Sequence, residues 1–303
     1  MGRRNQRGGS LLLGAHFSIA GGLHKAVERA CRYGCPVLQI FTKNASTWKE
    51  RLLSAQEIEQ FDRARRQANI QVVCSHAAYL INLASPDRSI HERSVNALGN
   101  ELRRSAQLHI PYVILHPGAH MGKGEGQGLR RVADSINKVF GHSPDEMSHL
   151  LLETTAGQGT SLGFRFEQLA SIADKVETKD KLGFCLDTCH VFAAGYDLRT
   201  RQTYNRTMAA FDTVLGLERL HVIHLNDAKK GLGSRVDRHE HIGEGAIGTK
   251  AFSLIMNDSC LRPMAKILET PKSHGVDHDR LDLERLRSLV GSVGGAVPVP
   301  FTN

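Results

Sequence analysis

The chain has 303 residues, of which 41% are hydrophobic and 23% are charged, and its formal net charge is +8. This apolar content can fill a packed core and excludes wholesale disorder, while the positive charge favours a polyanionic partner. The longest apolar runs, such as residues 11–13, are too short to span a bilayer, and six cysteines are too few for a disulfide scaffold. We therefore expect a cytoplasmic protein with no membrane segment.

Eight short β-prone apolar runs recur along the chain, and each run is followed by a stretch with the spacing of a helix. The runs cover residues 11–16, 37–42, 71–76, 112–116, 149–154, 182–187, 220–226 and 265–270. Strands that are apolar on both faces are typical of a parallel sheet covered by helices. After the second run, Ser54 and Glu57 predict a capping box at the start of a helix.

Eight strand–helix units in about 250 residues predict an α/β fold, the (β/α)₈ TIM barrel, as a single domain over residues 11–290. A doubly wound open sheet is the competing architecture, but Gly21-Gly22 after the first run does not fit its phosphate-binding fingerprint. We expect residues 1–10 to form a disordered basic tail and residues 291–303 a loose C-terminal tail.

Six consecutive predicted strands, the third to the eighth, end in an imidazole or a carboxylate. These residues are His76, His116, Glu153, Asp187 with His190 three positions later, His224 and Glu269. In a barrel the C-terminal ends of the strands meet at one rim, so these side chains should converge. Imidazole and carboxylate are the ligands of Zn²⁺ and similar ions, and a buried cluster of charges needs a compensating cation.

The connection over residues 228–250 is long, polar and rich in glycine, which in a compact domain usually indicates function. Asp237 and His239 alternate in its extended part and would point the same way, as would His241. Spacing alone therefore leaves open whether His239 or His241 joins the rim. It also leaves open the choice between His221 and His224.

Motifs along most of the chain resemble the endonuclease IV (type 2 AP endonuclease) family of DNA repair enzymes. The matching segments are 14–22, 41–44, 76–83, 116–118, 153–159, 187–190, 193–198, 224–229, 235–239 and 268–270. The resemblance implies a (β/α)₈ barrel that holds three zinc ions. It also favours His224 and His239 in the two open choices, which would leave His221 and His241 with structural roles.

The resemblance assigns nine metal ligands, in three sets. His76 and His116 would bind one zinc ion and Glu153 would bridge it to a second, Asp187, His224 and Glu269 would complete the second site, and His190, Asp237 and His239 would hold the third. Glu153 would also act in catalysis by orienting the nucleophile. The implied reaction is hydrolysis of the phosphodiester 5′ to an abasic site in duplex DNA during base excision repair, leaving a 3′-hydroxyl and a 5′-deoxyribose phosphate, by a monomeric enzyme.

Rim loops carry the candidate DNA contacts. Tyr79 matches the family residue that enters the DNA groove, although a packed loop aromatic is the alternative interpretation. Basic residues on these loops could bind phosphates: Lys43, Lys229, Arg235 and Arg238. Ser46 departs from the family pattern, because family members carry a long side chain there as a wedge.

A metal-dependent sugar isomerase or epimerase on the same barrel is the rival hypothesis. Such enzymes generally need one or two ions, and would have no use for a third site at residues 235–239 or for a net charge of +8. A non-catalytic DNA-binding protein is a second rival, but it would need no buried ring of ligand-type residues.

Overall fold

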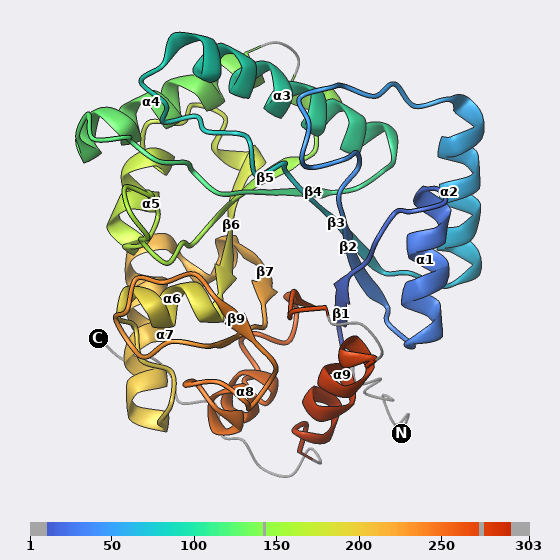
Figure 1. The fold of residues 1–303 in the computed structure, drawn as a ribbon, viewed down its shortest axis with the longest axis vertical. Coiled ribbons are helices and arrows are strands. Elements are labelled where there is room, and N and C mark those ends of the chain that lie inside the picture. Colours follow the sequence, from blue (N-terminus) through green and yellow to red (C-terminus); the bar gives the residue numbers. More distant parts are fainter. Residues whose placement is uncertain (1–10, 142–143, 273–275, 292–303) are drawn as a thin grey trace, which may run out of the picture.

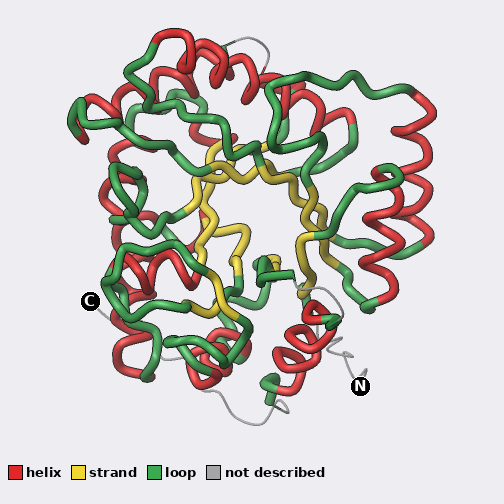
Figure 2. Tube along the Cα trace, in the orientation of Figure 1, coloured by secondary structure: helices red, strands yellow, loops and turns green. Residues whose placement is uncertain are grey.

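The computed structural model describes residues 11–141, 144–272 and 276–291, and in it a closed ring of parallel strands is surrounded by helices (Figures 1 and 2). The strands of the ring are β1 (Leu13–His16), β2 (Val37–Ile40), β3 (Val72–His76), β4 (Tyr112–Leu115), β5 (His149–Glu153), β6 (Leu182–Asp187), β7 (Leu220–His224) and β10 (Ala265–Leu268). Their spatial order is β1-β10-β7-β6-β5-β4-β3-β2, so each strand pairs with its sequence neighbours and β1 closes on β10. The eight-stranded barrel predicted from the sequence is confirmed.

The helices lie outside the ring (Figure 2). Each of them contributes apolar side chains to the buried core around the strands. They are α1 (Leu23–Arg32), α2 (Ala55–Gln67), α3 (Arg88–Gln107), α4 (Glu125–Phe140), α5 (Phe166–Ala173), α6 (Thr188–Ala194), α7 (Arg201–Leu215), α8 (Thr249–Met256) and α9 (His278–Ser288). The predicted capping box is confirmed: Ser54 Oγ accepts from the Glu57 backbone at 3.2 Å, and the Glu57 side chain accepts from Ser54 N at 3.0 Å. Short 3₁₀ turns at Pro144–Glu146, Lys179–Lys181 and Leu217–Arg219 precede β5, β6 and β7.

The inside of the barrel is filled with side chains and is apolar away from the C-terminal rim. A cluster of inward-facing residues forms this part of the core: Val37, Cys74, Ile114, Leu151, Cys185, Val222, Ala265 and Ile267. Outward-facing residues of the same strands, such as Leu38 and Leu150, are fully buried under the helices. The strands are thus apolar on both faces, as the sequence indicated.

Two features of the second half of the chain add to the predicted pattern. The short helix α6 follows β6 without a loop, and the Asp187 side chain caps it by accepting from His190 N at 2.9 Å. In the long connection after β7, β8 (Asp227–Ala228) pairs in antiparallel fashion with β9 (His239–Glu240). Residues 1–10 and 292–303, where tails were expected, lie outside the described residues. In the described ranges, every helix is too short or too polar to cross a membrane.

Candidate metal centre

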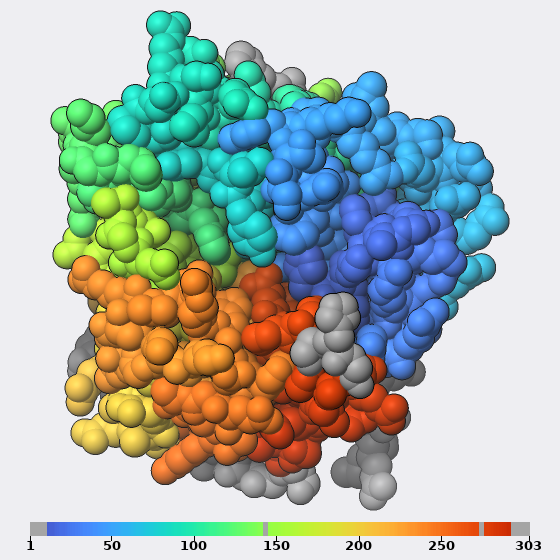
Figure 3. Space-filling model, in the orientation of Figure 1, coloured from blue at the N-terminus to red at the C-terminus, as the bar shows by residue number. Residues whose placement is uncertain are grey.

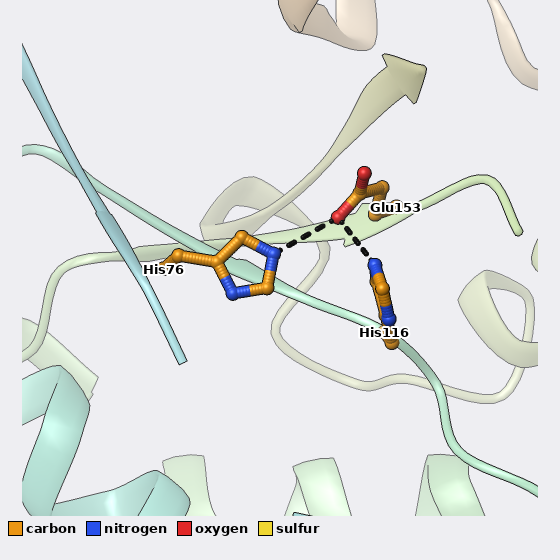
Figure 4. A group of neighbouring side chains, drawn as sticks. All are labelled: His76, His116 and Glu153. Carbon is orange, nitrogen blue, oxygen red and sulfur yellow. Dashed lines mark hydrogen bonds and ion pairs between the residues drawn. The ribbon is translucent and has the colours of Figure 1, made fainter. Parts of the chain in front are cut away.

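Glu153 is the central residue of a buried cluster at the C-terminal rim of the barrel. It ends β5, it is fully buried, and both of its oxygens face imidazoles. Oε2 lies 3.1 Å from His76 Nε2 and 2.9 Å from His116 Nε2, as Figure 4 shows. Oε1 lies 2.9 Å from His224 Nδ1 and 3.4 Å from His190 Nδ1. One carboxylate therefore joins two separate groups of potential ligands.

The second group surrounds the Oε1 side of Glu153. His224 Nδ1 lies 3.2 Å from Glu269 Oε2 and 3.8 Å from Asp187 Oδ2. One potential ligand atom from each of Glu153, Asp187, His224 and Glu269 lies within 4.8 Å of the other three. Three carboxylates and one imidazole at this spacing form a donor set for a divalent cation.

The third group combines α6 with the long connection after β7. Asp237 lies between two imidazoles, with Oδ2 at 3.2 Å from His190 Nε2 and Oδ1 at 3.5 Å from His239 Nε2. His239 Nε2 is also 3.7 Å from Asp187 Oδ2. Although this nitrogen is buried, it makes no hydrogen bond to the described part of the chain. A ring nitrogen left in this way has its lone pair available for a metal ion.

In four of these imidazoles, one ring nitrogen lies within hydrogen-bond distance of a backbone or amide oxygen that can accept its hydrogen. His76 Nδ1 lies 2.8 Å from Ala77 O, His190 Nδ1 lies 2.8 Å from Thr154 O, and His239 Nδ1 lies 3.1 Å from Glu269 O. A carbonyl oxygen can only accept, so in the neutral ring the other nitrogen carries the lone pair. Metal-binding histidines are held in this way in known proteins, and the arrangement fits a metal centre.

Gln39 provides the fourth such oxygen, and the sequence reasoning missed it. His224 Nε2 lies 2.8 Å from Gln39 Oε1, while Gln39 Nε2 is within hydrogen-bond distance of Glu269 Oε1 and lies 2.9 Å from His16 Nδ1. Gln39 is fully buried in the middle of β2. The available signal was a single polar residue inside an otherwise apolar strand.

The pKa values show a cluster that requires positive charge. Burial alone would raise the pKa of Glu153, but the imidazoles of His116 and His224 outweigh it and hold the pKa well below its usual range. Burial opposes the charged form of His190 too, yet the carboxylates of Asp187 and Asp237 raise its pKa well above the ordinary value. The raised pKa values of His76, His190 and His224 favour protons on these rings when no metal ion is bound. Metal binding would release these protons.

Two histidines that the spacing left open lie elsewhere. His221 lies near the opposite end of the same strand as His224, where its ring stacks on Tyr112 with centroids 5.0 Å apart. His241 lies outside the cluster, with Nδ1 at 2.9 Å from Asp282 Oδ2 and its ring stacked on His278. The structure therefore brings His224 and His239 into the rim cluster and leaves His221 and His241 apart from it.

The candidate DNA contacts lie around the cluster with unequal exposure. Tyr79 is 67% exposed and its ring lies 5.6 Å from that of His76. The Lys43 side chain is largely buried and donates to Thr47 O, whereas the Lys229 side chain is exposed and lies 3.8 Å from Glu240. The guanidinium of Arg235 lies 4.6 Å from the ring centroid of Phe164, and Arg238 Nη1 donates to Asp237 O at 2.7 Å.

A cavity of about 230 Å³ opens beside the cluster. Its walls include Tyr79, His116, Gln158 and Asp237, so two of the candidate ligands face its interior. In the space-filling view, the orange part of the chain, which contains the connection after β7, covers one side of this face of the molecule (Figure 3). The cluster is therefore buried within the barrel but open to a ligand on the rim side.

The fold and the rim cluster define a class: (β/α)₈-barrel proteins with adjoining His and carboxylate metal sites. Residues 27–289 match the family model described as xylose isomerase-like TIM barrel. A probable endonuclease 4 of Chloroflexus aggregans is 49% identical over 91% of this chain and 97% of its own. The structure of endonuclease IV from Thermus thermophilus superposes with a TM-score of 0.82 at 37% identity, covering 92% of this chain and 98% of that one.

A D-tagatose 3-epimerase-like protein is also similar, with a TM-score of 0.69, but at 16% identity this shows the common barrel alone. The two endonucleases are far more similar in sequence, and their matches extend over nearly their whole length. The chain belongs to the endonuclease IV family of AP endonucleases.

Proposed function

We propose that this chain is a zinc-dependent AP endonuclease that hydrolyses the phosphodiester 5′ to an abasic site in duplex DNA, leaving a 3′-hydroxyl and a 5′-deoxyribose phosphate. The single observation that carries the proposal is the position of Glu153, whose two oxygens face two different groups of imidazoles. A carboxylate in this position can bridge two cations. The sequence identity to proteins named as endonucleases supports this reaction and a role in base excision repair.

Nine side chains would hold three zinc ions. His76, His116 and Glu153 would form the first site, Glu153, Asp187, His224 and Glu269 the second, and His190, Asp237 and His239 the third. Bound zinc lowers the pKa of water and neutralises charge on phosphate oxygens. The imidazoles and carboxylates of this chain are distributed so that each proposed site receives both types of donor.

The residues around the cavity would bind and orient the substrate. Asp237 and His116 line this cavity and would face the reacting group. An abasic nucleotide flips out of the duplex at least cost because no base is stacked or paired there. The exposed ring of Tyr79 lies where it could enter the gap left by that nucleotide.

The basic residues Lys229, Arg235 and Arg238, with Lys43 deeper in its loop, would contact the phosphates that flank the lesion. Such contacts position a duplex without reading its bases, so the enzyme should act in any sequence context. We further propose that it works as a monomer, since one chain supplies all nine proposed ligands and no site needs a second copy. We also propose that it acts in the cytoplasm, as the sequence led us to expect.

A direct test uses a duplex with one synthetic abasic site and an otherwise identical undamaged duplex. The purified protein should cut only the first, on the 5′ side of the lesion, and the new end should be a 3′-hydroxyl that a polymerase extends. Elemental analysis of the same preparation should give three zinc ions per chain. One or two ions, together with conversion of a sugar substrate and no cleavage, would instead support an epimerase.

A further inference from the structure

Asp227 is a buried carboxylate next to the metal cluster but outside it. It follows Asn226, whose Nδ2 donates to Asp187 Oδ2 at 2.6 Å, yet it belongs to none of the groups of potential ligands. Its own hydrogen bonds come from backbone N–H groups. Oδ1 accepts from Ala228 at 2.8 Å and from Ile247 at 2.9 Å, and Oδ2 accepts from Gly243 at 2.9 Å and from Gly248 at 3.2 Å.

Three of these four bonds, those from Gly243, Ile247 and Gly248, tie the start of the long connection to its end. Ala228 pairs with His239 in the β8–β9 ribbon, and Lys229 N donates to Arg238 O at 2.9 Å. Asp237 and His239 therefore lie at the base of a loop whose two ends meet at Asp227. The residues that follow β9, 243–248, wrap around the carboxylate.

The glycines of this segment show how closely the backbone approaches. Gly243 and Gly248 have φ values of 79° and 75°, which other residues adopt at a cost. A Cβ atom on Gly245 would lie 2.5 Å from both Ala228 O and Asp227 Oδ1. The wrapping of residues 243–248 around Asp227 thus requires glycine at the point of closest approach.

We propose that Asp227 is a positioning residue for the third metal site: its carboxylate holds the connection so that Asp237 and His239 face His190. The inference rests on the proposed function for the identity of that site. Both side-chain oxygens of Asp227 must act as hydrogen-bond acceptors, because backbone N–H groups point at each of them. In Asp227→Asn, an NH₂ group would replace one oxygen and face two N–H donors, so two of the four hydrogen bonds would be lost.

The test measures two properties of Asp227→Asn beside the parent protein. In metal-free protein, amide hydrogen exchange over residues 237–248 should accelerate at least about tenfold in the variant, with exchange in β5 unchanged. In zinc titrations, one ion of three should bind about 10–100-fold more weakly, as when groups supporting a ligand are removed. Gly245→Ala, which disturbs the same contact from the backbone side, should change both properties in the same direction.

Glu244→Gln is the matched control, since Glu244 lies on the same segment but is exposed and contacts Arg285 at 3.1 Å. It should leave exchange and zinc binding at the parental values. Unchanged exchange in Asp227→Asn, or a parallel increase in β5 with weakening of all ions, would overturn the inference. A parent protein that binds fewer than three ions would contradict the proposed function, whereas the exchange measurement would still decide the role of Asp227.

Discussion

Histidines at the two ends of the barrel differ in their charged neighbours. At the C-terminal rim, burial opposes protonation of His76 and His190, but neighbouring carboxylates raise the pKa of both. At the other end, burial lowers the pKa of His149, helped by Lys181, and burial lowers that of His221, helped by His149. Burial opposes protonation at both ends, although His149 and His221 are only half-buried. Carboxylates outweigh burial at His76 and His190, but at His16 of the same rim burial outweighs the carboxylate of Glu269 and lowers the pKa.

A histidine of the candidate metal site and a structural histidine differ in the groups that their rings contact. His221 stacks on Tyr112 at the bottom of the barrel, where burial and the neighbouring His149 lower its pKa, so its neutral form is favoured. His224, three residues further along the same strand, faces Glu153 and Glu269. The two residues therefore differ both in their end of the strand and in the charge of their surroundings.

The largest expected effect is that of Glu153→Gln at the rim. Removing the charge that joins the two imidazole groups should lower the rate of abasic-site cleavage by about 10²–10⁴-fold, the range for a lost group of this kind. Single-turnover cleavage of an abasic duplex measures it, with His221→Gln as the control at the opposite end. Near-parental cleavage by Glu153→Gln would show that Glu153 is not the central residue.

A second prediction concerns Lys266 of β10, whose ammonium donates to Leu261 O at 2.6 Å and Met264 O at 3.1 Å. Burial lowers its pKa from 10.5 to about 8. Because the folded-state pKa is the lower one, the protonated lysine destabilises the fold below pH 8, and this cost disappears as the pH rises to 10.5. At about 1.36 kcal/mol per unit, the cost is at most about 3 kcal/mol.

Urea unfolding of the parent and of Lys266→Met across about pH 7–10.5 measures this effect. The parent should gain stability relative to the variant as the pH rises, by up to about 3 kcal/mol. A constant difference between the two proteins would mean that Lys266 titrates normally in the folded chain. Cleavage activity at neutral pH should be unaffected, since Lys266 lies away from the rim.

Tyr79→Ala should produce a smaller effect that is confined to substrate recognition. The ring is exposed and contacts Phe41 and His76 at its base, with centroids 5.4 and 5.6 Å away. Loss of a stacking side chain costs about 1–3 kcal/mol in single-strand systems. Equilibrium binding should therefore weaken by this amount for an abasic duplex and much less for an undamaged one. Equal weakening on both duplexes would assign Tyr79 a packing role.

The smallest expected effect is that of His221 on the pH dependence of the free energy of unfolding. The lowered pKa of His221 means that the folded state favours the neutral ring, so stability falls as the pH drops through 6.5. His221→Gln removes this contribution, and its stability should decline less than that of the parent between about pH 7 and pH 5. If both proteins lose stability equally, the ring of His221 is not held neutral.

Much of the fold and of the rim cluster could be predicted from the sequence because both repeat a regular pattern. Eight apolar runs define the strands, and the parallel arrangement puts their C-terminal residues at one end, so His76 and Glu153 meet although they are 77 positions apart in the chain. Asp237 was harder to place, because it lies outside the repeat in a connection whose path depends on the β8–β9 pairing.

Gln39 and Asp227 escaped the sequence reasoning for a different reason. Gln39 is not a usual metal ligand, and Asp227, although a carboxylate that closely follows a strand, is not assigned to a metal site. Each acts through hydrogen bonds to groups distant in sequence: Gln39 to His224 and Asp227 to residues 243–248. Such partners become apparent only when the barrel closes and the long connection folds back.

The most direct measurement of the central claim is anomalous scattering at the zinc absorption edge from crystals of the zinc-loaded protein. Three peaks should appear at the C-terminal rim: one between His76, His116 and Glu153, one between Glu153, Asp187, His224 and Glu269, and one between His190, Asp237 and His239. The opposite end of the barrel, at His149 and His221, should show none. Fewer peaks at the rim, or a peak at the opposite end, would contradict the claim that carboxylate-paired histidines form this enzyme's metal centre.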